Sequence, residues 1–182
     1  MATTEAPAST TWKIDPVHSS VEFAVKHLMF TTVKGRFADV EGTISIVPND
    51  PSKSSVSATI KAASIDTRTG QRDDHLRSID FLHAEQYPEL TFTSTRIAGD
   101  KDKFKVTGQL TIRGVTREVV LEASEEGSGK DPWGGERIGF SATTKLDRRD
   151  FGLVWNQAIE SGGVVVGNEV KVSIEVQAVR QS

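Results

Sequence analysis

Apolar and polar residues alternate along most of this chain. In the segment VEFAVKHL, Val21, Phe23 and Val25 fall on one side of an extended strand, and Glu22 and Lys26 fall on the other. The same alternation recurs in TISIV, SVSATIKA, KFKVTGQLTI and EVKVSIEVQAV. Successive side chains of a β-strand point to opposite faces, so each segment predicts a strand with one buried and one solvated face.

The last of these strands has the clearest alternation. Valine or isoleucine occupies every second position from Val170 to Val176. Ala178 precedes Val179, so we interpret the end of this strand as a slip in the alternation.

Turn-forming residues separate the strands at 48–52, 98–102, 113–114 and 125–135. With ELTFTST, VTREVVLEA and RIGFSATTKL added, the pattern predicts about eight strands in an antiparallel meander. Eight such strands can close into a barrel that holds one small ligand. A two-layer sandwich would show the same alternation, so the preference for a barrel rests on the strand count.

One stretch interrupts the β pattern. Residues 71–81, QRDDHLRSIDF, are dense in Arg, Asp and His. Leu76 and Ile79 have helical spacing, Thr69 is the expected N-cap, and Pro88 is expected to end the helix. The sequence therefore predicts an all-β domain with one short helical insertion.

Composition narrows the class of protein. The 182 residues fit one domain, expected over 11–182, after a disordered polar tail at 1–10. A net charge of −3 predicts no nucleic-acid partner, and the absence of cysteine excludes disulfides and thiolate metal sites. We find no apolar run of the ~18 residues needed to span a bilayer. The first residues lack the features of a secretory signal, so a cytoplasmic location is expected.

Candidate chemistry concentrates in the interrupting stretch. Asp73, Asp74 and His75 supply acids and a base, but there is neither a G-x-S-x-G serine nor a cysteine nucleophile. Charged runs of this kind are most often a solvated helix face, and that interpretation is favoured over catalysis. Four histidines lack the H-E-x-x-H spacing of a metal site, so no metal is predicted: His18, His27, His75 and His83.

Two further positions have two interpretations each. His27 continues the apolar face of its strand, so it is either a hydrogen-bonded core histidine or a polar group inside a cavity. In DRRDFGLVWN, Arg148 or Arg149 is expected to face an anionic head group while Phe151 and Trp155 face an apolar tail. The alternative is a strand entrance with solvated arginines.

The chain resembles the YceI-like family in segments that run in order from Trp12 to Ala178: DPVHSSVEFAVKHL, VKGRF, SIDTRTGQRDDHLRSIDFLHAEQYPELTFTST, GQLTIRGVTREVVLEA, GFSATTKLDRRDFGLVWN and VGNEVKVSIEVQA. That family is described as polyisoprenoid-binding, with a lipocalin-like, extended eight-stranded antiparallel barrel. The resemblance implies that an isoprenoid, an isoprenoid quinone or a related amphiphilic lipid occupies the interior, with no other cofactor. It also makes a homodimer an expectation.

Site residues follow from this combination. The residues expected to line the barrel and contact a lipid tail are Val21, Phe23, Val25, Phe37, Ile44, Ile60, Phe81, Phe92, Phe140, Leu153 and Trp155. The residues expected at the head group or polar rim are His18, His27, Arg72, Asp73, His75, Arg77, Arg149 and Asn156. Two other functions stay open: an enzyme that uses the Asp73 and His75 cluster on a lipid-like substrate, and a stress-response module with a solid barrel.

Overall fold

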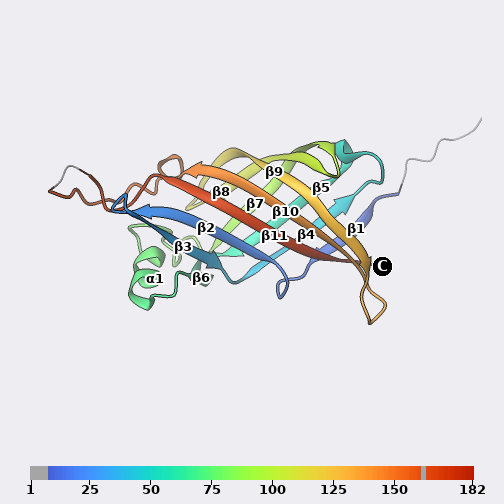
Figure 1. The fold of residues 1–182 in the computed structure, drawn as a ribbon, viewed down its shortest axis with the longest axis horizontal. Helices are drawn as coiled ribbons and strands as arrows, with labels where there is room; N and C mark the ends of the chain where they lie inside the picture. The colour runs from blue at the N-terminus through green and yellow to red at the C-terminus, as the bar shows by residue number, and fades with distance from the viewer. Residues whose placement is uncertain (1–7, 161–162) are drawn as a thin grey trace, which may run out of the picture.

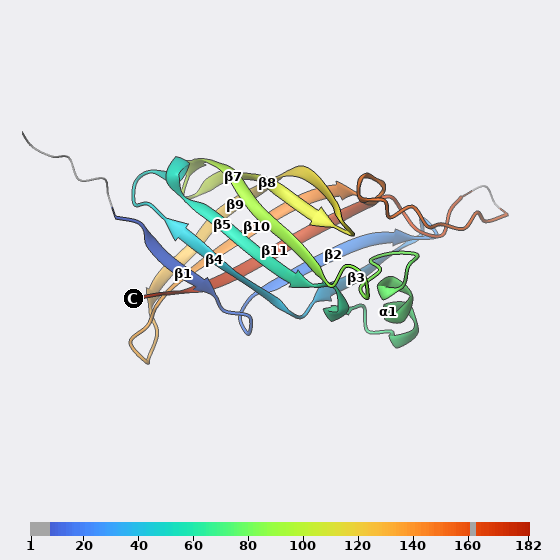
Figure 2. The same ribbon diagram turned by 180° about the vertical axis from the view of Figure 1, so that it is seen from behind.

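A single antiparallel sheet curls around a long interior, with one short helix beside one end (Figures 1 and 2). The structure is a computed structural model that describes residues 8–160 and 163–182. Its strands are β1 (Thr10–Ile14), β2 (Ser20–His27), β3 (Thr31–Phe37), β4 (Val40–Ile46), β5 (Ser55–Lys61), β6 (Ile65–Asp66), β7 (Glu89–Asp100), β8 (Lys103–Ile112), β9 (Val115–Lys130), β10 (Glu136–Asp147) and β11 (Glu169–Arg180). Its helical elements are η1 (Pro51–Lys53), η2 (Ala62–Ser64), α1 (Gly70–Arg77) and η3 (Arg148–Phe151).

The sheet closes because β1 pairs with both β4 and β11. β11 meets β1 at Arg180 opposite Trp12, and it meets β2 at Ile174 opposite Val21. β1 and β2 are thus one interrupted barrel strand. β3 and β4 form the next one, beside β2 and β1, and β6 and β5 form the third, beside β3 and β4. The predicted eight-stranded antiparallel barrel with one short helix is confirmed, and the sandwich is excluded.

The alternation predicted the inward faces, with one error at the end of β11. Val170, Val172, Ile174 and Val176 line the interior. Ala178 is fully buried and packs in a cluster with Trp12 and Ile138, so it continues the inward series. The expected slip is therefore wrong: a small side chain stands at this inward position beside the large indole ring.

The helix is shorter than predicted. Thr69 precedes α1, but its side chain makes no capping hydrogen bond. Ser78 adopts an extended conformation and ends the helix well before Pro88. Ile79 lies beyond the helix and is 63% exposed. The helical spacing of Leu76 and Ile79 therefore extends beyond the residues that form the helix, because α1 ends at Arg77.

The expected tail at 1–10 falls mostly on residues outside those described. Thr10 already belongs to β1, where it pairs with Ile46 of β4. Among the described residues, no helix is long and apolar enough to cross a membrane.

A polar network connects the interruption between β1 and β2 to β10, β11 and the β9–β10 turn, at the end of the barrel away from α1. Asp15 accepts hydrogen bonds from His18 at 2.7 Å and from Arg137 at 2.8 Å. Arg137 also donates to Asp131 and to Gln177, both at 2.8 Å. The hydrogen bond from His18, followed by that from Arg137, lowers the pKa of Asp15 to about 2.

We predict that Asp15→Asn lowers the free energy of unfolding by about 1–2 kcal/mol at pH 7. The native pKa lies below the unfolded value of about 3.9, so the carboxylate stabilises the fold above that pH. This contribution disappears as the pH falls toward 2, and the difference between the two proteins should shrink with it. Urea unfolding at several pH values measures the difference. Asp39→Asn, on the exposed bend after β3, controls for loss of a charge, and a difference independent of pH would contradict the assignment.

Candidate functional site

A cavity of about 1290 Å³ runs through the interior of the barrel. Val, Ile, Leu, Phe and Ala side chains from the inward faces make most of its wall. It reaches exposed residues at both ends, with Pro48 and Lys101 at the η1 end and His27 and Gln71 at the α1 end. Ligand pockets typically measure ~300–1,000 Å³, so this interior can enclose a long apolar chain.

Two glycines help to keep the interior hollow. The ring of Phe23 lies against Gly35, where an added Cβ would stand 2.4 Å from the ring. The ring of Phe92 lies in the same way against Gly108, where an added Cβ would stand 2.5 Å away. Both rings thus pack on the backbone of the neighbouring strand, and the close approach requires that glycine occupy the position.

All of the apolar residues predicted to contact a tail line this cavity. Phe23 and Phe37 form a tilted ring pair at 5.7 Å between centroids, and Phe81 and Trp155 form another at 5.4 Å. The strand faces predicted to point inward therefore do surround one cavity, and so does the segment after η3 that contains Leu153.

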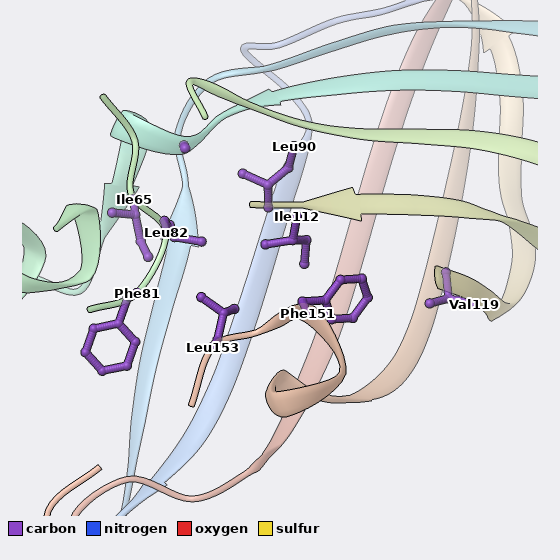
Figure 3. Close-up of a cluster of buried hydrophobic side chains, with 9 residues drawn as sticks. Ile65, Phe81, Leu82, Leu90, Ile112, Val119, Phe151 and Leu153 are labelled. Atoms are coloured by element: carbon purple, nitrogen blue, oxygen red, sulfur yellow. The ribbon is translucent and has the colours of Figure 1, made fainter. Parts of the chain in front are cut away.

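A compact apolar cluster fills one side of the barrel at the α1 end. It consists of Ala62, Ile65, Phe81, Leu82, Leu90, Ile112, Val119, Phe151 and Leu153, and Figure 3 shows side chains of this cluster from β6, β7, β8, β9, the segment before β7 and the segment at and after η3. Phe151 is 2% exposed. The exposed lining residues at this end lie instead on the β2–β3 hairpin and α1, so we place the opening of the cavity between those two elements.

Charged residues divide the cavity into two unlike ends. At the α1 end the charged and titratable side chains of the wall are Lys26, His27, Arg72, His75 and Arg148. The carboxylates of the wall, Asp100 and Glu125, lie near Lys101 at the η1 end. The α1 end of this wall is therefore electropositive.

Arg72 is fixed in place without a carboxylate partner. Its Nε donates to the Thr67 hydroxyl at 2.7 Å, and its Nη2 donates to the Thr67 carbonyl at 2.8 Å and to the Thr69 hydroxyl at 3.2 Å. Within the described part of the chain, Nη1 has no hydrogen-bond partner and Arg72 forms no salt bridge. A preorganised guanidinium edge is thus available to an acceptor in the cavity.

Asp73 lies outside the cavity wall, contrary to the prediction. It is buried, and it accepts hydrogen bonds from the Thr67 backbone N–H at 2.8 Å and from the Thr67 hydroxyl at 2.5 Å. Because Thr67 in turn holds Arg72, Asp73 is a positioning residue. Two residues later on α1, His75 does line the cavity, and its ring meets Trp155 edge-on at 4.7 Å between centroids.

Two arginines follow β10, and the one predicted at the polar rim, Arg149, does not line the cavity, whereas Arg148 does. Arg149 is exposed and pairs with Asp147 at 2.6 Å. Arg148 is buried and lines the cavity, and it donates to four backbone carbonyls, those of Leu153, Trp155, Val166 and Gly167. Burial lowers the pKa of Arg148 from its usual range. Consecutive residues of the η3 turn point in different directions, and two adjacent arginines give no indication in the sequence of which side chain enters the cavity.

Two other predicted rim residues hold the fold together instead. His18 bonds Asp15, away from the cavity. Arg77 donates to the carbonyls of Ala63 at 2.9 Å and Ile65 at 3.0 Å, so it fastens α1 to the β5–β6 strand. Their charges suggested a ligand, but backbone carbonyls and a carboxylate already satisfy them.

The last two candidates lie on the chain segments around the opening. Asn156 donates from its side-chain amide to the Val166 carbonyl at 2.7 Å, and its side-chain oxygen accepts the Val166 N–H at 3.0 Å. It does not line the cavity. His27 lines the cavity and is exposed, which favours the second of its two interpretations.

Sequence reasoning missed several polar lining residues at this end: Lys26, Thr67, Thr69 and Gln71. Thr67 and Thr69 precede the helix in the run DTRTGQ. Two hydroxyl side chains at alternate positions shortly before Arg72 could have indicated polar groups that hold its guanidinium. No group of three or more Asp, Glu or His side chains placed to hold a metal occurs in the described residues.

Comparison with known proteins identifies the family. The model of the YceI-like domain matches residues 12–178. The chain belongs to the YceI-like family. Protein YceI of Salmonella newport is 39% identical over 181 residues, which cover 98% of this chain and 92% of that protein. Protein YceI of Escherichia coli O157:H7 is 41% identical over 172 residues, or 93% of this chain and 87% of that protein.

Solved structures agree with this fold. The Campylobacter jejuni YCEI protein superimposes with a TM-score of 0.74 at 36% identity, covering 86% of this chain and 90% of that one. A polyisoprenoid binding domain from Saccharophagus degradans, implicated in plant cell wall breakdown, superimposes with a TM-score of 0.67 and covers 93% of this chain and 98% of that one. At 16% identity, the second likeness concerns the fold alone.

The arginine pair provides a matched test of this site. We predict that Arg148→Met lowers the free energy of unfolding by about 2–4 kcal/mol, because it leaves buried carbonyls without their donor. Arg149→Met should cost less than about 1 kcal/mol, because its partner is at the surface. Urea unfolding of both variants measures the contrast, and equal effects would contradict the assignment of the two side chains.

Proposed function

We propose that this protein binds one amphiphilic lipid, stores or transports it, and releases it unaltered. In this proposal the long apolar chain lies in the barrel and the polar head lies at the α1 end. The observation that carries the proposal is a hollow apolar interior with an arginine at one of its ends, Arg72, that forms no salt bridge within the described residues. Membership of the YceI-like family supports an isoprenoid or quinone-like lipid, and the fold of the polyisoprenoid binding domain points the same way.

The apolar chain supplies the driving force. Each methylene transferred from water contributes about 0.8 kcal/mol, so a chain of several isoprene units offsets association costs of up to ~15 kcal/mol. An apolar tube discriminates poorly between chains of similar width, so the head group must provide the selectivity. The free edge of Arg72 suits an acceptor such as a phosphate, a carboxylate or a carbonyl.

Catalysis is the second candidate function, because His75 borders the cavity and bonds Asp80 at 2.9 Å. Against it, the Asp73 carboxylate is committed to Thr67 and lies outside the wall. The two functions differ in the chemical fate of the ligand. A carrier releases the same lipid that it takes up, whereas an enzyme releases a product.

Blocking the interior tests the proposal. Ala142 lines the cavity in the middle of β10, and Thr143 beside it is exposed. We predict that organic extracts of the purified protein contain about one lipid per chain by mass spectrometry, and that Ala142→Trp reduces this amount several-fold. Thr143→Trp adds the same side chain to the outer face and should leave the amount unchanged. An extract without stoichiometric lipid, or equal loss in both variants, would refute the carrier.

The head-group assignment has its own test. We predict that Arg72→Gln weakens binding of a prenyl phosphate about tenfold or more, because a charge-assisted hydrogen bond is lost. Binding of the corresponding prenyl alcohol should change much less. Arg68→Gln, at an exposed position outside the cavity wall, is the matched control. Equal weakening for both lipids would place the head group elsewhere.

A further inference from the structure

The tip of the β2–β3 hairpin carries two exposed apolar side chains. Met29 is 56% exposed and Phe30 is 79% exposed. Leu28 and Met29 have positive φ angles of 52° and 61°, which make the turn tight. The turn therefore presents a methionine and a phenylalanine on a narrow protrusion, where burial of neither contributes to the stability of the chain.

This protrusion lies beside the opening of the cavity. The Leu28 N–H donates to the Val165 carbonyl at 2.8 Å, and His27, which lines the cavity, bridges to Val166. Figures 1 and 2 show the hairpin tip and this neighbouring segment projecting from the barrel at the end where α1 lies. Val154, 66% exposed, adds an apolar side chain one residue before Trp155 of the cavity wall.

The flanks of the hairpin are basic. Lys26 and Lys34 are both exposed, and no Asp or Glu occurs between Phe23 and Ala38. Glu160, on the neighbouring segment, offsets part of this charge. Exposed apolar side chains next to lysines are a combination typical of protein surfaces that bind the interface of an anionic membrane.

We propose that the protein docks on an anionic lipid bilayer through this hairpin, with Met29 and Phe30 inserted at the interface and Lys26 and Lys34 at the level of the head groups. Docking places the opening of the cavity against the source or destination of the lipid, so this inference rests on the proposed carrier function. A bilayer fits better than a protein partner because a stable interface needs ~800 Å² from each side, and an aromatic side chain supplies only ~150–250 Å².

Vesicle binding tests the inference. We expect the protein to sediment with vesicles of phosphatidylcholine and phosphatidylglycerol, to bind pure phosphatidylcholine vesicles more weakly, and to lose part of the binding at high salt. The double variant Met29→Ser/Phe30→Ser should bind several-fold less. Trp133→Ser removes an 84% exposed aromatic residue from the β9–β10 turn and should bind as the unmodified protein does. Phe30→Trp should show a blue-shifted emission with the anionic vesicles.

The outcomes separate this inference from the carrier function. If extracts contain lipid but the protein binds neither kind of vesicle, docking is refuted and the carrier stands. Concentration-dependent self-association that depends on Phe30, without vesicle binding, would assign the tip to a second copy and also refute docking. Vesicle binding that Trp133→Ser weakens as much as the double variant would likewise overturn it. Lipid-free extracts refute the carrier, whatever the vesicles show.

Discussion

Closure of the sheet is the constraint on which the rest of the structure depends. Because β1 pairs with both β4 and β11, the inward side chains of all the barrel strands share one interior, and the alternation along β7 shifts at the bulge between Ser94 and Arg96. An eight-stranded barrel is just wide enough for side chains to fill it or for one ligand to be held. Here Phe23 and Phe92 lie on Gly35 and Gly108, and small residues such as Ala142 occupy inward positions, so the interior stays hollow.

The two ends of the barrel handle polar groups differently. Near the far end, Arg137 is shared between the carboxylates of Asp15 and Asp131, and this network stabilises the fold. At the α1 end, Arg148 is held by backbone carbonyls alone and Arg72 by threonine oxygens and a carbonyl. Among the residues that the structure describes, the proposed head-group end has positively charged side chains in the cavity wall and no carboxylate there to pair with them.

The sequence allowed the local periodic features to be predicted, because they depend on neighbouring residues. The period of two located the inward face of each strand and the apolar wall of the cavity, and the family resemblance added the closed barrel. Prediction from the sequence failed where contacts between distant segments decide which side chain is buried. Arg148 and Arg149 differ only in which of them meets the carbonyls of a later segment, and Ala178 appeared as a slip because its large partner, Trp12, comes from the opposite end of the chain. A homodimer and a cytoplasmic location stay predictions.

A crystal structure of the protein purified without detergent tests the central claim most directly. We predict continuous, elongated electron density along the interior, with its polar end within hydrogen-bonding distance of the Arg72 guanidinium. An interior filled by its own side chains, with the rings of Phe23 and Phe92 turned away from their glycines into the lumen, would contradict the account.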